Sequence, residues 1–327
     1  MLDIYGTLGP ACADQETLCD MFTAGMTGVR LNLSHVSLPQ AADQIAALHA
    51  AAACCGKQAQ LLIDMQGPEL RIGTLSEPLV LEDGCEVTLG AGGIPVPALV
   101  LFHLVPGQEI LLDDGKLLLE VRSLSETGAR AAVLRGGTLQ SRKSIALPGS
   151  RLHPSTMTER DLENISRARE FGVTAVMQPF VRDRTDLEAV RLALQDADCG
   201  HIRLFAKIEN REGVENLDEL IPACDEIVIA RGDLGNAIPL WQLPRVQKEI
   251  AAKCRAAGRA FMVVTQMLAS MERSPVPTRA EVSDVFNAVC DGAASVMVTG
   301  ETAVGDYPAE VIRYLANTAS EALAYSG

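Results

Sequence analysis

Eight short apolar runs recur along the chain, and segments with helical patterning separate them. The runs are Ile4–Leu8, Val29–Leu33, Gln60–Met65, Ala175–Gln178, Arg203–Ile208, Glu226–Ala230, Phe261–Val264 and Ser295–Val298. Continuous apolar runs are typical of parallel strands that are buried on both faces. Eight of them alternating with helices predict an α/β fold, a (β/α)₈ TIM barrel, whose active site lies at the carboxyl ends of the strands.

Helix signals fill the gaps between these runs. A Thr followed three residues later by an acid, which satisfies the free amides of a helix start, occurs at Thr158 and at Thr278. The helical segments predicted from apolar spacing, capping residues and terminal glycines are Asp14–Ala24, Pro39–Cys54, Pro244–Ala257 and Pro308–Ala324.

One interval, residues 72–143, interrupts the alternation with short strands and turn signals such as Asp83-Gly84. The expected strands are Leu79–Leu81, Glu86–Leu89, Leu99–Phe102, Glu109–Leu112, Leu117–Val121 and Ala129–Leu134. We therefore expect a catalytic barrel domain over 1–71 and 144–327 and a small inserted β-barrel domain over 72–143. An insertion at the active face is placed to act as a lid; a domain without a role in catalysis is the plainer alternative.

Composition narrows the class of protein. The chain has 327 residues, 48% of them hydrophobic, so one barrel of about 250 residues plus an insertion fits its length. No apolar stretch reaches the roughly 18 residues of a membrane span, and the N-terminus lacks the basic start of a signal peptide. The nine cysteines show no CxxC spacing and are typical of small buried residues in a reducing compartment. We expect a cytoplasmic protein with no membrane partner.

The formal net charge of −14 argues against nucleic acid as a partner, because binding to a phosphate backbone needs a basic surface. Small anionic substrates stay possible, since they need only a local cluster of Arg and Lys or a divalent cation.

Strand alternation predicts which polar residues at the ends of the runs lie on the same face. Residues two apart in an extended segment share a face, which groups Lys207 with Glu209 and Arg231 with Asp233. Glu209 and Asp233 would then lie at the tips of neighbouring strands, where two carboxylates suit Mg²⁺ or Mn²⁺. Lys207 beside the ion could stabilise a transferring phosphoryl group. Ordinary salt bridges at strand ends are the alternative.

Other strand-end groups are weaker signals taken singly. Arg30, Asn32 and Ser34 share a face by the same rule. Gly232 lets a ligand approach the backbone closely, although glycine also serves any strand-to-helix turn. Thr265 and Thr299 offer hydroxyls at the ends of the seventh and eighth strands, and either could simply be a helix cap.

Seven blocks of the chain together resemble the pyruvate kinase family, in the family's order and over almost the whole chain. They are 28–35 (GVRLNLSH), 64–71 (DMQGPELR), 207–213 (KIENREG), 230–235 (ARGDLG), 265–271 (TQMLASM), 277–281 (PTRAE) and 299–308 (TGETAVGDYP). The inserted β-domain also resembles that family's lid.

The resemblance implies a role for each matching residue. Glu209 and Asp233 correspond to the ligands of the divalent metal, and Lys207 and Arg30 to the groups that contact the phosphoryl group in flight. Lys207, Arg30 and Thr265 thus form the expected catalytic set.

The resemblance also implies binding contacts. The amides of Gly232 and Asp233, with the Thr265 hydroxyl beside them, correspond to the site of the phosphoenolpyruvate carboxylate, which Lys207 completes. The matching contacts of the nucleotide phosphates are Arg71, His35 and Lys143.

A monovalent-cation site is implied in the same way. Its matching ligands are Asn32, Ser34, Asp64 and the Met65 carbonyl. Glu69 stands where family members that need K⁺ tend to carry glutamate, so we expect a K⁺ requirement.

Several positions depart from the family pattern. Asp3 stands in place of a lysine, Pro179 and Thr299 each replace a serine, and Ala237 replaces a glutamate, but none of these changes removes an expected ligand. The sequence also stops after the eighth barrel helix, which leads us to expect a short form that lacks the family's C-terminal allosteric domain. Whether the chain forms a homo-oligomer stays open.

The expected reaction is phosphoryl transfer between phosphoenolpyruvate and ADP, giving pyruvate and ATP, with Mg²⁺ (or Mn²⁺) and K⁺. Positioning and cationic stabilisation by Lys207 and Arg30 are what phosphoryl transfer requires. Two alternatives stay open: a catalytically weak homologue that binds phosphoenolpyruvate and regulates a partner, and a metal-enolate lyase or aldolase acting on another 2-oxo acid.

Overall fold

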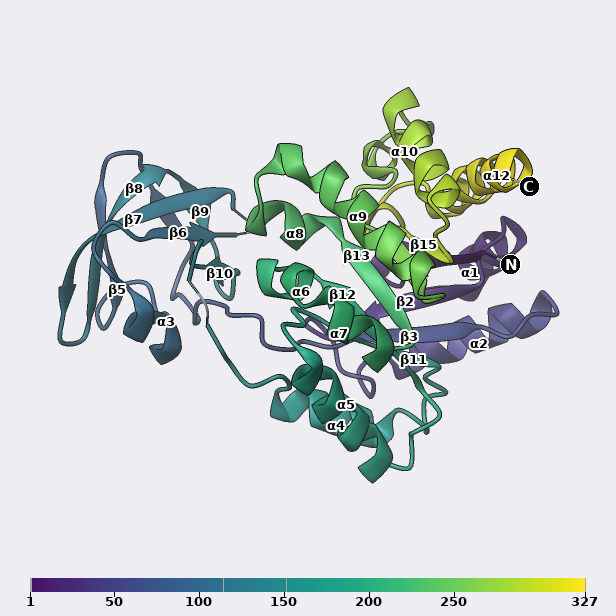
Figure 1. Ribbon diagram of the computed structural model, residues 1–327, viewed down its shortest axis with the longest axis horizontal. Helices are drawn as coiled ribbons and strands as arrows, with labels where there is room; N and C mark the ends of the chain where they lie inside the picture. The colour runs from purple at the N-terminus through teal and green to yellow at the C-terminus, as the bar shows by residue number, and fades with distance from the viewer. Residues whose placement is uncertain (1, 114, 151, 327) are drawn as a thin grey trace. The chain divides into compact units, whose positions relative to one another are not determined.

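The chain divides into two compact units in the computed structural model, which describes residues 2–113, 115–150 and 152–326. The first unit comprises residues 1–67 and 156–327, and the second comprises residues 68–155 (Figure 1). The second unit extends beyond the interval 72–143 at both ends.

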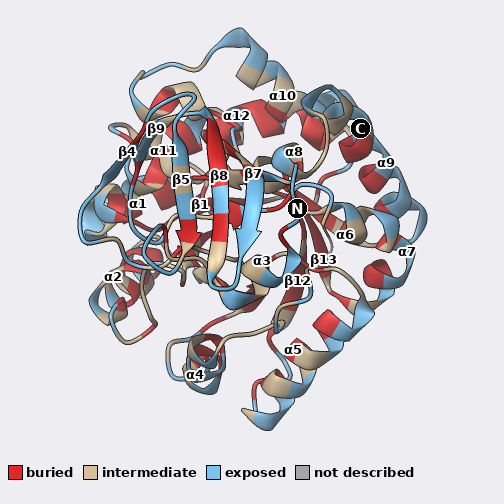
Figure 2. Ribbon diagram, turned by 90° about the vertical axis from the view of Figure 1, so that its left-hand side faces the viewer, coloured by how far each residue is buried: buried red, intermediate tan, exposed pale blue. Residues whose placement is uncertain are grey.

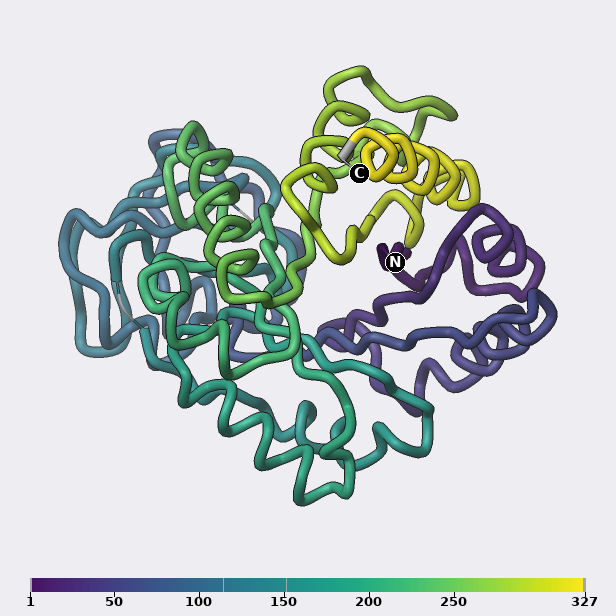
Figure 3. The backbone as a smooth tube through the Cα atoms, turned by 45° about the vertical axis from the view of Figure 1, so that its right-hand side comes forward, coloured from purple at the N-terminus to yellow at the C-terminus, as the bar shows by residue number. Residues whose placement is uncertain are grey.

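Eight parallel strands of the first unit close into a barrel in the order β1-β15-β14-β13-β12-β11-β3-β2. They are β1 (Asp3–Thr7), β2 (Gly28–Asn32), β3 (Gln60–Asp64), β11 (Ala175–Gln178), β12 (Arg203–Ile208), β13 (Glu226–Ala230), β14 (Ala260–Val264) and β15 (Ser295–Met297). The first strand pairs with the last, so both ends of the chain lie on the same side of this unit (Figure 3). The predicted TIM barrel is confirmed, and each predicted run matches a strand to within one residue at either end.

Helices surround the strands of this barrel. The longer ones are α1 (Gln15–Thr23), α2 (Ala42–Cys54), α4 (Glu159–Arg167), α5 (Arg184–Asp196), α9 (Leu243–Ala256), α10 (Arg279–Cys290) and α12 (Pro308–Ser326). Short helical segments are η1 (Pro10–Cys12), α6 (Arg211–Glu215), α7 (Leu217–Leu220), η2 (Ile221–Ala223), α8 (Arg231–Ala237), η3 (Leu240–Gln242), η4 (Ala269–Glu272) and α11 (Gly300–Ala303). Figure 2 shows the outward faces of α5 and α7 exposed to solvent.

The predicted capping residues begin the helices they were expected to begin. Thr158 Oγ1 accepts a hydrogen bond from the Asp161 amide at 3.1 Å, while Asp161 Oδ2 accepts one from the Thr158 amide at 2.9 Å. Thr278 and Glu281 make the same reciprocal pair at the start of α10. Each pair satisfies two amides that a helix start leaves free.

Strand alternation divides the barrel core into two parts. Residues such as Leu62, Phe205 and Val228 belong to a cluster inside the barrel. Their strand neighbours, such as Ile227, belong to a larger cluster between strands and helices. Both faces of each strand are therefore apolar, which is why the runs show no hydrophobic–polar alternation.

The second unit has its own apolar core and two antiparallel sheets. A five-stranded sheet has the order β10-β6-β7-β8-β5, and β4 pairs with β9. The strands are β4 (Leu79–Leu81), β5 (Glu86–Gly90), β6 (Glu109–Leu112), β7 (Leu117–Ser125), β8 (Gly128–Arg135), β9 (Gly137–Leu139) and β10 (Ile145–Ala146). The expected closed β-barrel is therefore wrong for the described residues of this unit, because β4 and β9 pair apart from the other strands.

One predicted strand of this unit is also wrong. Residues 99–102 lie in a helix, α3 (Ala98–His103), that begins after Pro97. A run of four apolar residues is too short to distinguish a strand from a helix. The helix buries Val100 and leaves Phe102 89% exposed, so only one side of the run contacts the core.

Candidate active site

Four charged side chains from three strands meet at the carboxyl end of the barrel. Arg30 Nη2 lies 2.7 Å from Asp64 Oδ2, and Lys207 Nζ lies 3.1 Å from the same oxygen. Lys207 Nζ also lies 2.9 Å from Glu209 Oε1. The carboxyl groups of Asp64 and Glu209 are almost fully buried, so this is a desolvated network of alternating charge rather than a surface salt bridge.

Alternation along the strands explains why these residues meet. Leu62 and Phe205 point into the barrel. Asp64 and Lys207 follow them by two residues and therefore point the same way, at the mouth. Arg30 pairs in register with Leu62 across β2 and β3. Strand alternation in the sequence groups Lys207 with Glu209, and the family resemblance assigns Asp64 to the monovalent-cation site. The pairing of Asp64 with Arg30 and Lys207 depends on the closure of the barrel.

The charged side chains of the network shift one another's pKa values. Burial raises the pKa of Glu209 to about 7, with Asp233 and Asp64 adding to the rise and Lys207 opposing it. Burial alone would lower the pKa of Lys207, but Asp64 and Glu209 outweigh it and raise that pKa. Lys207 therefore stays an ammonium.

Glu209 has a second anchor that the sequence analysis missed. Its Oε2 accepts a hydrogen bond from the Phe180 amide at 2.9 Å. Phe180 follows Pro179 at the end of β11 and has a φ of +51°, an uncommon value for a residue with a side chain. This turn aims a backbone donor at the carboxylate, and nothing in the local sequence signals it.

Asp233 and Arg231 do not share a strand face, so that expectation is wrong. Strand β13 ends at Ala230, and Arg231 is already the first residue of α8. In a helix, residues two apart point to different sides. Asp233 nevertheless acts on Glu209 electrostatically, adding to the rise of its pKa, although it lies in α8 and not at the tip of β13.

Arg231 instead holds the loop that carries Thr265. Its Nε and Nη2 both donate to the Thr265 carbonyl, at 3.1 and 2.7 Å, and its Nη1 pairs with Asp284 at 2.6 Å. Thr265 has a φ of +80° and Gln266 one of +54°. A branched residue with positive φ is strained, and such strain is found where a structure needs an unusual orientation.

Gly232 and Thr265 lie side by side, as their shared expected role requires. A Cβ added at position 232 would lie only 3.0 Å from Thr265 Cγ2. A larger residue would therefore displace the threonine. The strained loop and the start of α8 thus bring a hydroxyl, backbone amides and Asp233 to one place.

The expected monovalent-cation ligands are only partly arranged as the sequence indicated. Asn32 ends β2, but Ser34 lies in the following turn rather than on the strand, and its amide donates to Asn32 Oδ1 at 3.1 Å. Met65 is buried directly after Asp64. Asp161 holds the next residues of this loop, because its carboxylate accepts hydrogen bonds from the amides of residues 66 and 67.

A cavity of about 410 Å³ adjoins the charged network through Arg30. It is lined by Thr7, Leu8, Gly9, Pro10, Arg30, Leu31, Asn32, His35, Val36, Gln44, Thr299, Gly300, Ala303 and Val304. His35 and Thr299, which lie far apart in sequence, are thus brought to one cavity beside the expected catalytic arginine.

Arg71 and Lys143, the other expected nucleotide contacts, are neighbours within the second unit. Arg71 pairs with Ser144 in an isolated β-bridge, and its guanidinium contacts Glu69 at 2.7 Å. Lys143 lies 2.8 Å from Asp113. The structure therefore brings these two cations onto adjacent segments of the second unit.

The donor set at the barrel mouth fits a hard divalent cation. Among the described residues there is no group of three or more His, Cys, Asp or Glu side chains that could hold a metal. Glu209 and Asp233 provide two carboxylates, and Mg²⁺ is commonly bound by one or two carboxylates with substrate oxygens and water. These two residues would hold the ion.

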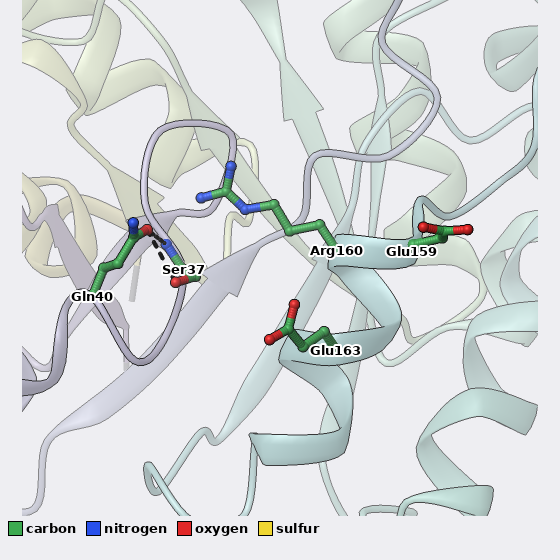
Figure 4. A pocket seen from close by; sticks show the side chains of 5 residues that line it. All are labelled: Ser37, Gln40, Glu159, Arg160 and Glu163. Atoms are coloured by element: carbon green, nitrogen blue, oxygen red, sulfur yellow. Dashed lines mark hydrogen bonds between the residues drawn. The ribbon is translucent and has the colours of Figure 1, made fainter.

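A second pocket of about 420 Å³ lies outside this network, between the start of α4 and the loop before α2 (Figure 4). Glu159, Arg160 and Glu163 line one side, and Ser37 and Gln40 line the other. It is a polar surface pocket that contains none of the expected site residues.

Comparisons with known proteins agree with the motifs. A family model described as pyruvate kinase, barrel domain, matches residues 2–312. The pyruvate kinase of Geobacillus stearothermophilus is 37% identical over 95% of this chain and 55% of its own length. That of Bacillus licheniformis is 38% identical over 97% and 56%, and that of Aeropyrum pernix is 36% identical over 98% and 70%. The chain thus spans little more than half the length of the Geobacillus and Bacillus relatives. None of its described helices is long and apolar enough to cross a membrane.

Proposed function

Because the chain belongs to the pyruvate kinase family, we propose that it transfers a phosphoryl group between phosphoenolpyruvate and ADP, giving pyruvate and ATP. The observation that supports this most directly is the buried network of Arg30, Asp64, Lys207 and Glu209 beside Asp233. It places two fixed cations next to two carboxylates, which suits an anionic substrate bound with a divalent metal.

The cations supply charge rather than protons. The raised pKa of Lys207 keeps it an ammonium, and Arg30 adds the delocalised charge of its guanidinium. In the proposed reaction the P–O bond to the enolate oxygen breaks as a nucleotide phosphate oxygen bonds to phosphorus. Negative charge builds up on the transferring oxygens, and positioned cations stabilise it.

The strained loop at Thr265 positions the carboxylate end of the substrate. The Thr265 hydroxyl and the amides at Gly232 and Asp233 are proposed to bind that carboxylate, which holds the reacting atoms in register with Lys207. The enolate then takes up a proton at carbon to become pyruvate. Mg²⁺ or Mn²⁺ bound at Glu209 and Asp233 would neutralise charge on the substrate oxygens.

The nucleotide is proposed to bind in the cavity that contains His35 and Arg30. Arg71 and Lys143 of the second unit remain proposed contacts of its phosphates on the strength of their sequence motifs. A role of the second unit as a lid is proposed on the same ground.

We further propose that K⁺ binds at Asn32, Ser34, Asp64 and the Met65 carbonyl, with Glu69 as the sequence mark of this dependence. A monovalent cation there would offset the carboxylate of Asp64 beside an anionic substrate. Activity should fall at least tenfold when K⁺ is replaced by tetramethylammonium at constant ionic strength. Full activity in tetramethylammonium would contradict the site.

Incubation of the protein with phosphoenolpyruvate, ADP, Mg²⁺ and K⁺, with pyruvate measured over time, tests the reaction. Pyruvate should form with wild type and not with Asp233→Asn at low Mg²⁺. Binding of phosphoenolpyruvate without turnover would instead indicate a regulatory homologue. Turnover confined to another 2-oxo acid would indicate a lyase.

A further inference from the structure

Three cysteines gather where α1 packs against the end of α2, away from the candidate active site. Cys19 lies in the middle of α1, Cys54 is the last residue of α2, and Cys55 follows it. The sequence alone separates Cys19 from Cys55 by 36 positions, and neither belongs to a recognisable motif.

One stripe of α1 faces these thiols. Gln15, Cys19 and Thr23 are spaced by four residues and therefore lie on one face of the helix. Gln15 Nε2 lies 3.4 Å from Cys54 Sγ, and Thr23 Oγ1 lies 4.0 Å from Cys55 Sγ.

The Cys19 and Cys55 side chains interlock between the two helices. Cys55 Sγ lies 3.7 Å from the Cys19 carbonyl oxygen, and Cys19 Sγ lies 3.7 Å from the Ala51 carbonyl oxygen on α2. Each sulfur thus contacts the backbone of the segment opposite it, and Cys55 Sγ contacts the backbone of Cys19 itself.

The backbone around the pair is held in place on both sides. Lys57 donates to the carbonyl of Phe22 and, at 3.4 Å, to that of Met26, which ties the end of α2 to the end of α1. Gly56, between Cys55 and Lys57, has a φ of +64°, which glycine adopts easily, so it makes the turn that brings Lys57 back onto the end of α1. Bridging two cysteines needs close backbones, and this junction supplies them.

The other cysteines do not join this cluster as a metal site. Cys12, Cys199, Cys224 and Cys254 are buried, and the described residues contain no group of three His, Cys, Asp or Glu side chains suited to a metal. Cys54 is exposed and Cys19 and Cys55 are half-buried, so the cluster is open to small molecules in solution.

We propose that Cys19 and Cys55 form a reversible dithiol–disulfide site that reacts with low-molecular-weight disulfides. The thiolate of one cysteine attacks a sulfur of the small disulfide, forms a mixed disulfide and releases one small thiolate. The second cysteine, as thiolate, attacks the protein sulfur of that bond and releases the second small thiolate. The protein is oxidised by two electrons, the small disulfide is reduced, and the two protons of the cysteine thiols end on the two small thiolates, by exchange with solvent, to give two small thiols.

The rate of cross-linking should rise with pH. Partial burial, and then the neighbouring Cys55, raises the pKa of the Cys19 thiol. Because the thiolate is the reacting form, cross-linking should speed up about tenfold per pH unit below that pKa. Cys55 lies just before β3 begins, at the end of the barrel opposite the candidate active site, so the cross-link should leave the turnover number unchanged.

Treatment of the folded protein with oxidised glutathione, followed by trypsin and mass spectrometry without reduction, tests the proposal. Cleavage after Arg30 and Lys57 should release residues 1–30 joined to residues 31–57, with a loss of two of the nine thiols. Cys54→Ser is the matched control and should cross-link like wild type. Cys19→Ser and Cys55→Ser should each stop at most at a glutathione adduct.

A second readout does not depend on peptide mapping. The cross-link should raise the thermal midpoint of wild type and of Cys54→Ser, and dithiothreitol should reverse the rise. No joined peptide in wild type would overturn the proposal. A joined peptide that persists in Cys55→Ser but disappears in Cys54→Ser would overturn it as well, by assigning the bond to Cys54.

Discussion

Lys207 is a fixed positive charge at the centre of the candidate site. Its ammonium contacts Asp64 and Glu209, and these acids outweigh the effect of burial on its pKa. Lys207→Met keeps the length of the side chain and removes the charge. We expect the turnover number to fall by about 10²–10³. Mn²⁺ affinity, measured by paramagnetic relaxation of water, should change little.

Lys253→Met is a suitable control for this substitution, because Lys253 pairs with Asp218 on the surface. It should keep nearly full activity. Wild-type turnover by Lys207→Met would show that the reaction does not use this charge.

Thr265 combines a functional hydroxyl with a strained backbone. Its φ of +80° is costly for a branched residue and easily adopted by glycine. Thr265→Gly and Thr265→Ala both remove the hydroxyl, but only glycine relieves the strain. We expect both variants to lose activity, and the glycine variant to be more stable than the alanine variant by about 1 kcal/mol. Urea unfolding measures the difference; equal or reversed stabilities would rule out strain at this residue.

At the scale of elements, the amino ends of the barrel strands carry a second buried polar cluster. Glu226 of β13 accepts a hydrogen bond from the Ser295 hydroxyl of β15 and lies 4.0 Å from Arg203 of β12. Burial raises the pKa of Glu226 to about 7, although Ser295 and Arg203 oppose the rise. The amino-terminal face of such barrels contributes to stability, whereas the chemistry takes place at the opposite face.

This cluster predicts a pH dependence of stability. The folded state binds a proton at Glu226 that the unfolded chain releases near pH 4.5, so the stabilisation is complete below pH 4.5 and is lost as the pH rises through about 7. Its full size is about 3 kcal/mol. Glu226→Gln mimics the protonated side chain and should reduce the slope of unfolding free energy between pH 4.5 and 7, the remainder coming from the raised pKa of Glu209. An unchanged slope would contradict the assignment.

At the scale of the whole molecule, two units with separate apolar cores make up the chain. Leu119 is fully buried in the core of the second unit, and Leu204 is fully buried in the barrel core. Leu119→Ala should destabilise its own unit by about 2–5 kcal/mol. Hydrogen exchange should then speed up in residues 68–155 and stay unchanged in β12 and β13. Leu204→Ala is the reciprocal control. Equal acceleration in both units would show that they unfold as one.

Much of the barrel was predictable from local patterns, because each strand is apolar on both faces and several helices, such as α4 and α10, begin at their own capping residues. The helical state of Leu99–Phe102 was not predictable, since four apolar residues fit a strand as well as a helix. Packing against the core of the second unit decides between them. The pairing of β4 with β9 was not predictable either, because it joins segments that are far apart in the sequence.

The sequence by itself determined the eight repeats, the strand ends at which chemistry is placed, and the family, because these follow from periodicities and motifs carried within short segments. Only the tertiary structure decided that Asp64 pairs with Arg30 and Lys207, that Phe180 donates to Glu209, and that Arg231 turns away from Asp233 to hold the Thr265 loop. The physical reason is that these interactions join residues from different strands. Their distances are set by the closure of the barrel and by backbone angles that no local pattern encodes.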